Sequence, residues 1–249
     1  MIDDLMLLSG NNIPFLKAGI TIHPPSIKEI AYITEKSFFT GCEMLNFSKD
    51  ILLNSEDKTG LENLSNFEVL MTIINEKNTQ ITEQRHCLLL VLSLIFPFYQ
   101  ISLLRDAIEL TESLENGLEE KHYIDKNNFE DFKIILKKMF CLDKGESAEL
   151  NPKGDLAKKI AAKLKERQRK LAKNSNGNGK ISILSRYVSI LAVGQQKDMN
   201  SLLNYTIYQL FDEYQRYELK VQSDAHMSAM LAGAKDLKEV ENWTKDIHS

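Results

Sequence analysis

The sequence predicts a mainly α-helical protein: a helical N-terminal domain with a short β-hairpin, a basic helical linker and a small C-terminal helical bundle. Apolar residues recur at helical spacing along most of the chain, two S-x-x-E capping patterns precede such stretches, and the local charge changes sign twice. The expected boundaries are 1–150, 151–180 and 181–249. Each outer part is long enough to hold a core of its own.

The charge distribution separates the three parts. Residues 152–180 hold ten Lys and Arg against two acids, a local charge of +8, whereas residues 1–151 carry −10 and residues 181–249 carry −2. The overall charge of −4 argues against a dedicated nucleic-acid-binding protein. The N-terminus has acids where a signal peptide needs positive charge, and the three cysteines form no C-x-x-C pair. We therefore expect a cytoplasmic protein with free thiols.

Capping and turn signals predict the first elements of the N-terminal part. Apolar alternation at 20–22 predicts a strand, paired with residues 13–16 as a short hairpin. The capping box at 26–29 predicts a helix that runs to about residue 45, with Gly41 as its weakest point. A second capping box at 65–68 predicts another helix.

The most apolar run, residues 87–104, is broken by Pro97. Only ten residues before the proline are uninterrupted, about half of what a bilayer-spanning helix needs. We therefore expect a buried helix at 82–96, an extended piece at 98–103 and no membrane role.

The end of the N-terminal part combines an acidic stretch with an amphipathic one. Residues 106–126 are polar, contain the turn signal Asn116-Gly117 and are expected to form short surface elements. Asn128 is expected to cap a helix with one apolar face and one face in water. The apolar face consists of Phe129, Phe132, Leu136, Met139 and Phe140, and the wet face of Lys133, Lys137 and Lys138.

The basic linker begins with Asn151-Pro152, a favourable helix start, and ends in the flexible composition NSNGNG at 174–179. Its apolar stripe is too narrow to stabilise a helix without a partner. A solvated linker, an arm that binds an acidic protein surface, and an arm for nucleic acid or a membrane surface are the three interpretations; the last is disfavoured because interleaved aromatic residues are missing. The partner-binding candidates are Leu156, Ile160, Leu164 and Leu171, with Lys159, Lys163 and Arg167 beside them.

The C-terminal part reads as three helices. The first is expected from Ile181 to a C-terminal stop at Gly194, and the last is a short amphipathic stretch around Trp243. Between them, apolar residues repeat at alternating intervals of four and three from 203 to 221, as in a coiled-coil seam. The seam predicts packing against another helix, of the same chain or of a second copy or partner. Its candidate binding residues are Leu203, Ile207, Leu210, Tyr214 and Tyr217.

No catalytic, cofactor-binding or metal-binding residues are predicted. The five histidines are scattered, and the glycine-rich nucleotide-binding motifs and the G-x-S-x-G nucleophile motif do not occur in the sequence. These observations favour a non-enzymatic protein without a cofactor.

A family resemblance is carried by several short stretches of the sequence. They are Ile22-His23-Pro24-Pro25-Ser26-Ile27-Lys28-Glu29-Ile30, Phe38-Phe39 and Leu94-Ile95-Phe96-Pro97, with Tyr187, Tyr214, Gly233 and Trp243 in the C-terminal part. These stretches resemble the tail assembly chaperones of long-tailed bacteriophages. The resemblance implies a helical N-terminal domain joined by a polar, basic linker to a helical extension, and a shorter form that ends near residues 145–152.

The resemblance also implies a role in virion assembly in the host cytoplasm. Such chaperones bind the tape-measure protein and help to recruit tail-tube subunits. The alternatives are a structural tail or baseplate protein that stays in the virion and, less favoured, a nucleic-acid-binding regulator that uses the basic arm.

Overall fold

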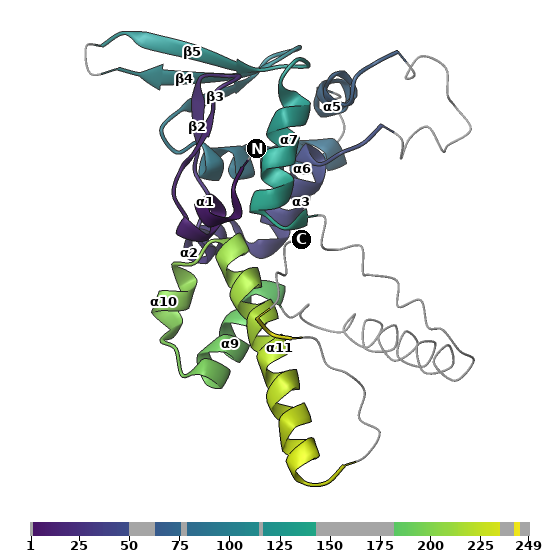
Figure 1. The fold of residues 1–249 in the computed structure, drawn as a ribbon. Helices are drawn as coiled ribbons and strands as arrows, with labels where there is room; N and C mark the ends of the chain where they lie inside the picture. The colour runs from purple at the N-terminus through teal and green to yellow at the C-terminus, as the bar shows by residue number, and fades with distance from the viewer. Residues whose placement is uncertain are drawn as a thin grey trace.

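A computed structural model describes residues 2–49, 63–75, 79–114, 117–142, 182–234 and 242–244. The protein is mainly α, as predicted, with a two-stranded and a three-stranded antiparallel sheet (Figure 1). The basic linker and most of the short amphipathic stretch predicted around Trp243 lie outside the described ranges. The helices are α1 Asp4–Ser9, α2 Ile27–Ile33, α3 Glu35–Leu45, α5 Asn66–Ile74, α6 Thr79–Ile95, α7 Phe129–Met139, α9 Ile183–Gln195, α10 Met199–Leu203 and α11 Ile207–Leu231; the strands are β1 Ile13–Phe15, β2 Ile20–Ile22, β3 Gln100–Leu103, β4 Ile108–Ser113 and β5 Glu119–Ile124.

The predicted hairpin is confirmed: β1 pairs with β2 in antiparallel register, with Ile13 opposite Ile22. The expectation of short surface elements at 106–126 is confirmed for β5, which is mostly exposed, but not for β4, which is partly buried; the two six-residue strands form a hairpin that adds to β3. The turn at Gly117, where φ is +77°, is confirmed. The strands were not recognised in the sequence because the segment is rich in charged residues. Those residues can be accommodated because most of β5 is exposed, while burial is concentrated in β4.

The first capping box is confirmed, but the helix that follows it breaks at Thr34 rather than at Gly41. Thr34 has a φ of +70° and its side chain caps α3, so α2 and α3 are separate helices. Gly41 instead marks a close approach to α6. A Cβ at Gly41 would lie 2.6 Å from the backbone oxygen of Cys87 and 2.6 Å from a methyl of Val91.

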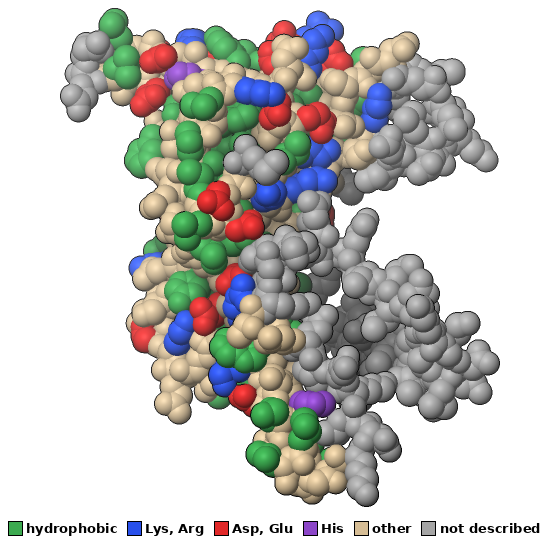
Figure 2. Space-filling view, viewed as in Figure 1, with side chains coloured by type: hydrophobic (Ala, Val, Ile, Leu, Met, Phe, Trp, Pro, Cys, Tyr) green, Lys and Arg blue, Asp and Glu red, His purple; other side chains and the backbone are tan. Residues whose placement is uncertain are grey.

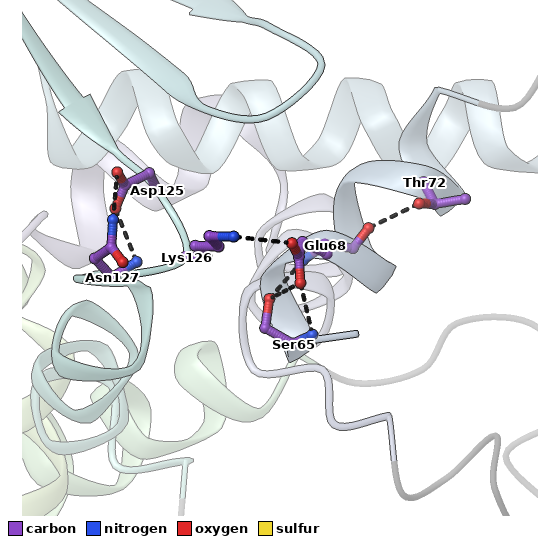
Figure 3. A network of polar contacts seen from close by, with 6 residues as sticks. All are labelled: Ser65, Glu68, Thr72, Asp125, Lys126 and Asn127. Carbon is purple, nitrogen blue, oxygen red and sulfur yellow. Dashed lines mark hydrogen bonds and ion pairs between the residues drawn. The ribbon is translucent and has the colours of Figure 1, made fainter. Parts of the chain in front are cut away.

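The second capping box, at the start of α5, also joins two distant segments (Figure 3). One carboxylate oxygen of Glu68 accepts a hydrogen bond from the backbone N–H of Ser65 at 2.8 Å, and the other faces Lys126 Nζ at 3.4 Å. The backbone and side-chain hydrogen bonds from Ser65 hold the pKa of Glu68 below its usual range. Lys126 belongs to the loop between β5 and α7, so the cap connects α5 to that loop.

The predicted apolar face of α7 is buried, but two neighbouring polar predictions are wrong. Asn128 makes no side-chain cap; its amide instead spans the loop, accepting from Asp125 N and donating to Tyr123 O, both at 2.9 Å. Lys133 is only 7% exposed, and its Nζ donates to Phe47 O at 2.7 Å. The hydrogen bond to the carbonyl of Phe47, in a distant segment, thus compensates the burial of this lysine.

The helix predicted through the seam is broken once, because residues 204–206 separate α10 from α11, although Asp198 caps α10 and α11 ends at Leu231 as expected. Thr206 and Gln209 form a capping box that starts α11. The predicted stop at Gly194 is wrong by two residues, because α9 runs through the glycine to Gln195 and the left-handed cap is Gln196, where φ is +55°. Gly194 lies close to α11: a Cβ there would lie 2.1 Å from the hydroxyl of Tyr217, so that side chain would have to move.

One cluster of buried apolar side chains includes residues from Leu7 to Leu210, drawn from both sides of the basic linker. Phe38, Phe67, Phe96, Phe129 and Phe132 are its largest fully buried members. None of the described helices is long and apolar enough to span a membrane.

Candidate partner-binding groove

The C-terminal helices are fixed to the N-terminal part by hydrogen bonds as well as by the core. Ile27 N donates to Tyr205 O at 2.8 Å, next to an antiparallel bridge between Ser26 and Thr206. Further along α11, Gln209 Nε2 donates to Leu8 O at 2.7 Å. These contacts place α9 and α10 beside α2 (Figure 1).

A groove of about 470 Å³ lies where α2, α9 and α10 meet. Its floor is apolar and buried, and comes from Ile27 and Ile30 of α2 and from Leu184 and Val188 of α9. Its rim is accessible to solvent because several of the remaining lining residues are exposed. The remaining lining residues are Ala31, Glu35, Ser182, Ser185, Ser189, Met199 and Leu203.

Glu35 is the charged group of the described lining, and its two carboxylate oxygens differ in environment. One accepts a hydrogen bond from the backbone N–H of Ile183 at 2.8 Å, so the carboxylate sits at the start of α9, where the helix dipole favours negative charge. The other oxygen, Oε2, is shielded from solvent and has no hydrogen-bond partner. The lining of an otherwise apolar groove therefore contains one carboxylate, held at the start of α9 by a backbone N–H.

The C-terminal half of α11 carries exposed apolar side chains among polar and charged ones (Figure 2). Its side chains include Val221, Met227, Met230 and Leu231, which are 46%, 56%, 54% and 86% exposed. The first half of the same helix is packed into the core, so α11 changes from a core helix to a projecting one along its length.

The structure places the predicted partner-binding residues in three environments. Leu203 lines the groove, whereas Ile207 and Leu210 are fully buried in the core. Tyr214 stacks on Tyr187 of α9 with ring centroids 4.0 Å apart, and Tyr217 packs partly buried against the core. The seam is thus occupied by α9 of the same chain, and binding through these five residues stays a prediction. Leu156, Lys159, Ile160, Lys163, Leu164, Arg167 and Leu171 lie outside the described residues.

Sequence reasoning placed Ile27 and Ile30 in a helix but missed the groove that they help to form. No signal singled out Glu35, because its backbone partner, Ile183, is 148 residues away along the chain. The described residues contain no group of three or more His, Cys, Asp or Glu positioned to hold a metal ion.

Comparisons with known proteins bear on the C-terminal part. Residues 174–248 match the family model described as the YomV second domain, which is a phage-derived domain. Comparison of the chain with curated proteins and with solved structures gives no match. The part of the chain that supplies α9, α10 and α11 is therefore similar to a phage-derived domain.

Proposed function

We propose that the protein is a non-enzymatic tail assembly chaperone of a phage, which binds the tape-measure protein and helps to recruit tail-tube subunits in the host cytoplasm. The similarity of residues 174–248 to a phage-derived domain supports a phage origin. The groove between α2, α9 and α10 is the observation that carries the binding role.

An apolar floor with an exposed rim suits an amphipathic helix laid along a groove, which buries its apolar side chains and leaves its polar face in water. The exposed apolar side chains of the C-terminal half of α11 offer additional contacts for the same purpose. A tape-measure protein is long and helical, and so would present such faces repeatedly. Covering them during tail assembly would prevent aggregation.

Co-expression with the tape-measure protein tests the proposal. We expect the two proteins to co-purify and the soluble fraction of the tape-measure protein to rise several-fold. No complex and no gain in solubility would rule out the chaperone function.

Mass spectrometry of purified virions separates the chaperone from a structural tail or baseplate protein. A chaperone leaves before the tail is mature and should be missing from the particle. Detection in a fixed ratio to the tail-tube protein would favour the structural role instead.

A further inference from the structure

We propose that the groove binds an amphipathic helix of a partner protein that presents one lysine or arginine to Glu35. This inference rests on the proposed function and specifies the chemistry of the partner segment. Its starting point is the carboxylate of Glu35, the charged group among the described residues that line the groove.

The carboxylate of Glu35 indicates the charge of the occupant. Glu35 is partly buried, and one of its oxygens accepts a hydrogen bond from the backbone N–H of Ile183. A helix laid over the groove displaces the water that remains around this carboxylate, and a neutral helix does not compensate that loss. A lysine or arginine on the helix compensates it with a charge-assisted interaction.

The rest of the lining indicates an apolar face around that cation. Of the described residues that line the groove, Glu35 alone is charged. The α9 wall presents the small hydroxyls of Ser182, Ser185 and Ser189, and the floor is aliphatic. A helix with aliphatic residues on one face and a single cation beside them matches this lining, whereas an acidic helix would bring a like charge next to Glu35.

Binding of two designed peptides to the full-length protein tests the inference. Both peptides are 18-residue amphipathic helices with a leucine face; one has a lysine beside that face, and the other has norleucine, a neutral residue of similar shape, at that position. We expect calorimetry to give about tenfold tighter binding of the lysine peptide to the wild-type protein. In E35Q, which keeps the acceptor for Ile183 N but removes the charge, this preference should disappear.

Two further variants make the result specific. E43Q, on the exposed side of α3, removes one negative charge outside the groove lining and should keep the tenfold preference. S189W places a large side chain on the exposed rim without changing the floor, and should abolish binding of both peptides while the melting temperature stays unchanged. Equal binding of the two peptides by the wild type, or a preference that survives in E35Q, would overturn the inference.

The outcome separates this inference from the proposed function. If S189W still solubilises the tape-measure protein, the chaperone function stands and the groove is not its binding site. If the peptides show the expected preference but the tape-measure protein is not bound, the groove chemistry stands and the chaperone function fails. A wild-type dimer that S189W converts to a monomer would show that a second copy occupies the groove, which contradicts the inference.

Discussion

Replacing Gly41 with alanine should destabilise the protein, although alanine is the better helix former. Helix propensity alone predicts a gain of about 1 kcal/mol. The structure predicts the opposite, because the new Cβ would lie 2.6 Å from Cys87 O and from Val91 Cγ2, about 0.8 Å inside the 3.4 Å limit of ordinary contact. One of these atoms is backbone, so α3 and α6 must separate, and such overpacking costs about 1–3 kcal/mol. Subtracting the gain in helix propensity leaves a net loss of about 0–2 kcal/mol in the free energy of unfolding. We expect a value of about 2 kcal/mol, because backbone atoms must move.

Urea denaturation and thermal melting measure this effect. A loss of about 2 kcal/mol lowers Tm by about 4–8 °C in a protein of this size. G194A is the matched control, because its Cβ meets the far end of the Tyr217 side chain, which can rotate away, and its cost should be smaller. Adding V91A to G41A should restore only part of the stability, since the contact with Cys87 O remains. An unchanged or higher Tm for G41A would refute the close approach of α3 and α6.

Three other predictions concern buried or capping polar groups. Ser26→Ala should cost about 1 kcal/mol at pH 7 in urea denaturation. Burial raises the pKa of Glu29, but hydrogen bonds from Ser26 outweigh this effect and the net pKa is lowered. The contribution of these bonds is therefore full above the usual carboxyl pKa and is lost as the pH falls through the lowered pKa, so the difference between wild type and variant should shrink in acid. Lys133→Met should cost about 1–3 kcal/mol because Phe47 O loses its donor, and a cost under 0.5 kcal/mol would contradict the burial. Asn128→Ala and Asn128→Asp should both lower Tm, because alanine loses both bonds, whereas aspartate keeps the acceptor for Asp125 N but sets an oxygen against Tyr123 O; an unchanged Tm for either variant would contradict the observed bonds.

The features that could be predicted from the sequence are those set by neighbouring residues. The boxes at Ser26 and Ser65 depend on a side chain and a backbone N–H three residues apart, so spacing alone revealed them. The apolar face of α7 was equally readable, since helical periodicity defines it. The equivalent box at Thr206 was missed because the heptad-like repeat runs across it and suggested a continuous helix.

The features that could not be predicted depend on segments far apart in the sequence. Lys133 is buried because its Nζ donates a hydrogen bond to the carbonyl of Phe47, 86 residues away along the chain. No local sequence pattern predicts this contact. Strand β5 contains three charged residues in its first three positions, which resembles a surface loop until its pairing with β4 is known. The groove arises only when α2 meets α9, across a separation of more than 150 residues, so its lining could not be listed from spacing.

The core shared across the basic linker has a consequence for how the chain can be divided. Residues 2–142 and 182–234 are joined by Ile27 N to Tyr205 O, by Ile183 N to Glu35 and by common buried side chains, none of which requires the intervening peptide. Two separately expressed fragments should therefore reassemble into the native protein. A product that ended near residue 150 would instead lack the helices that cover Leu7, Ile27 and Ile30. Its exposed apolar side chains would favour aggregation or association with the missing C-terminal part.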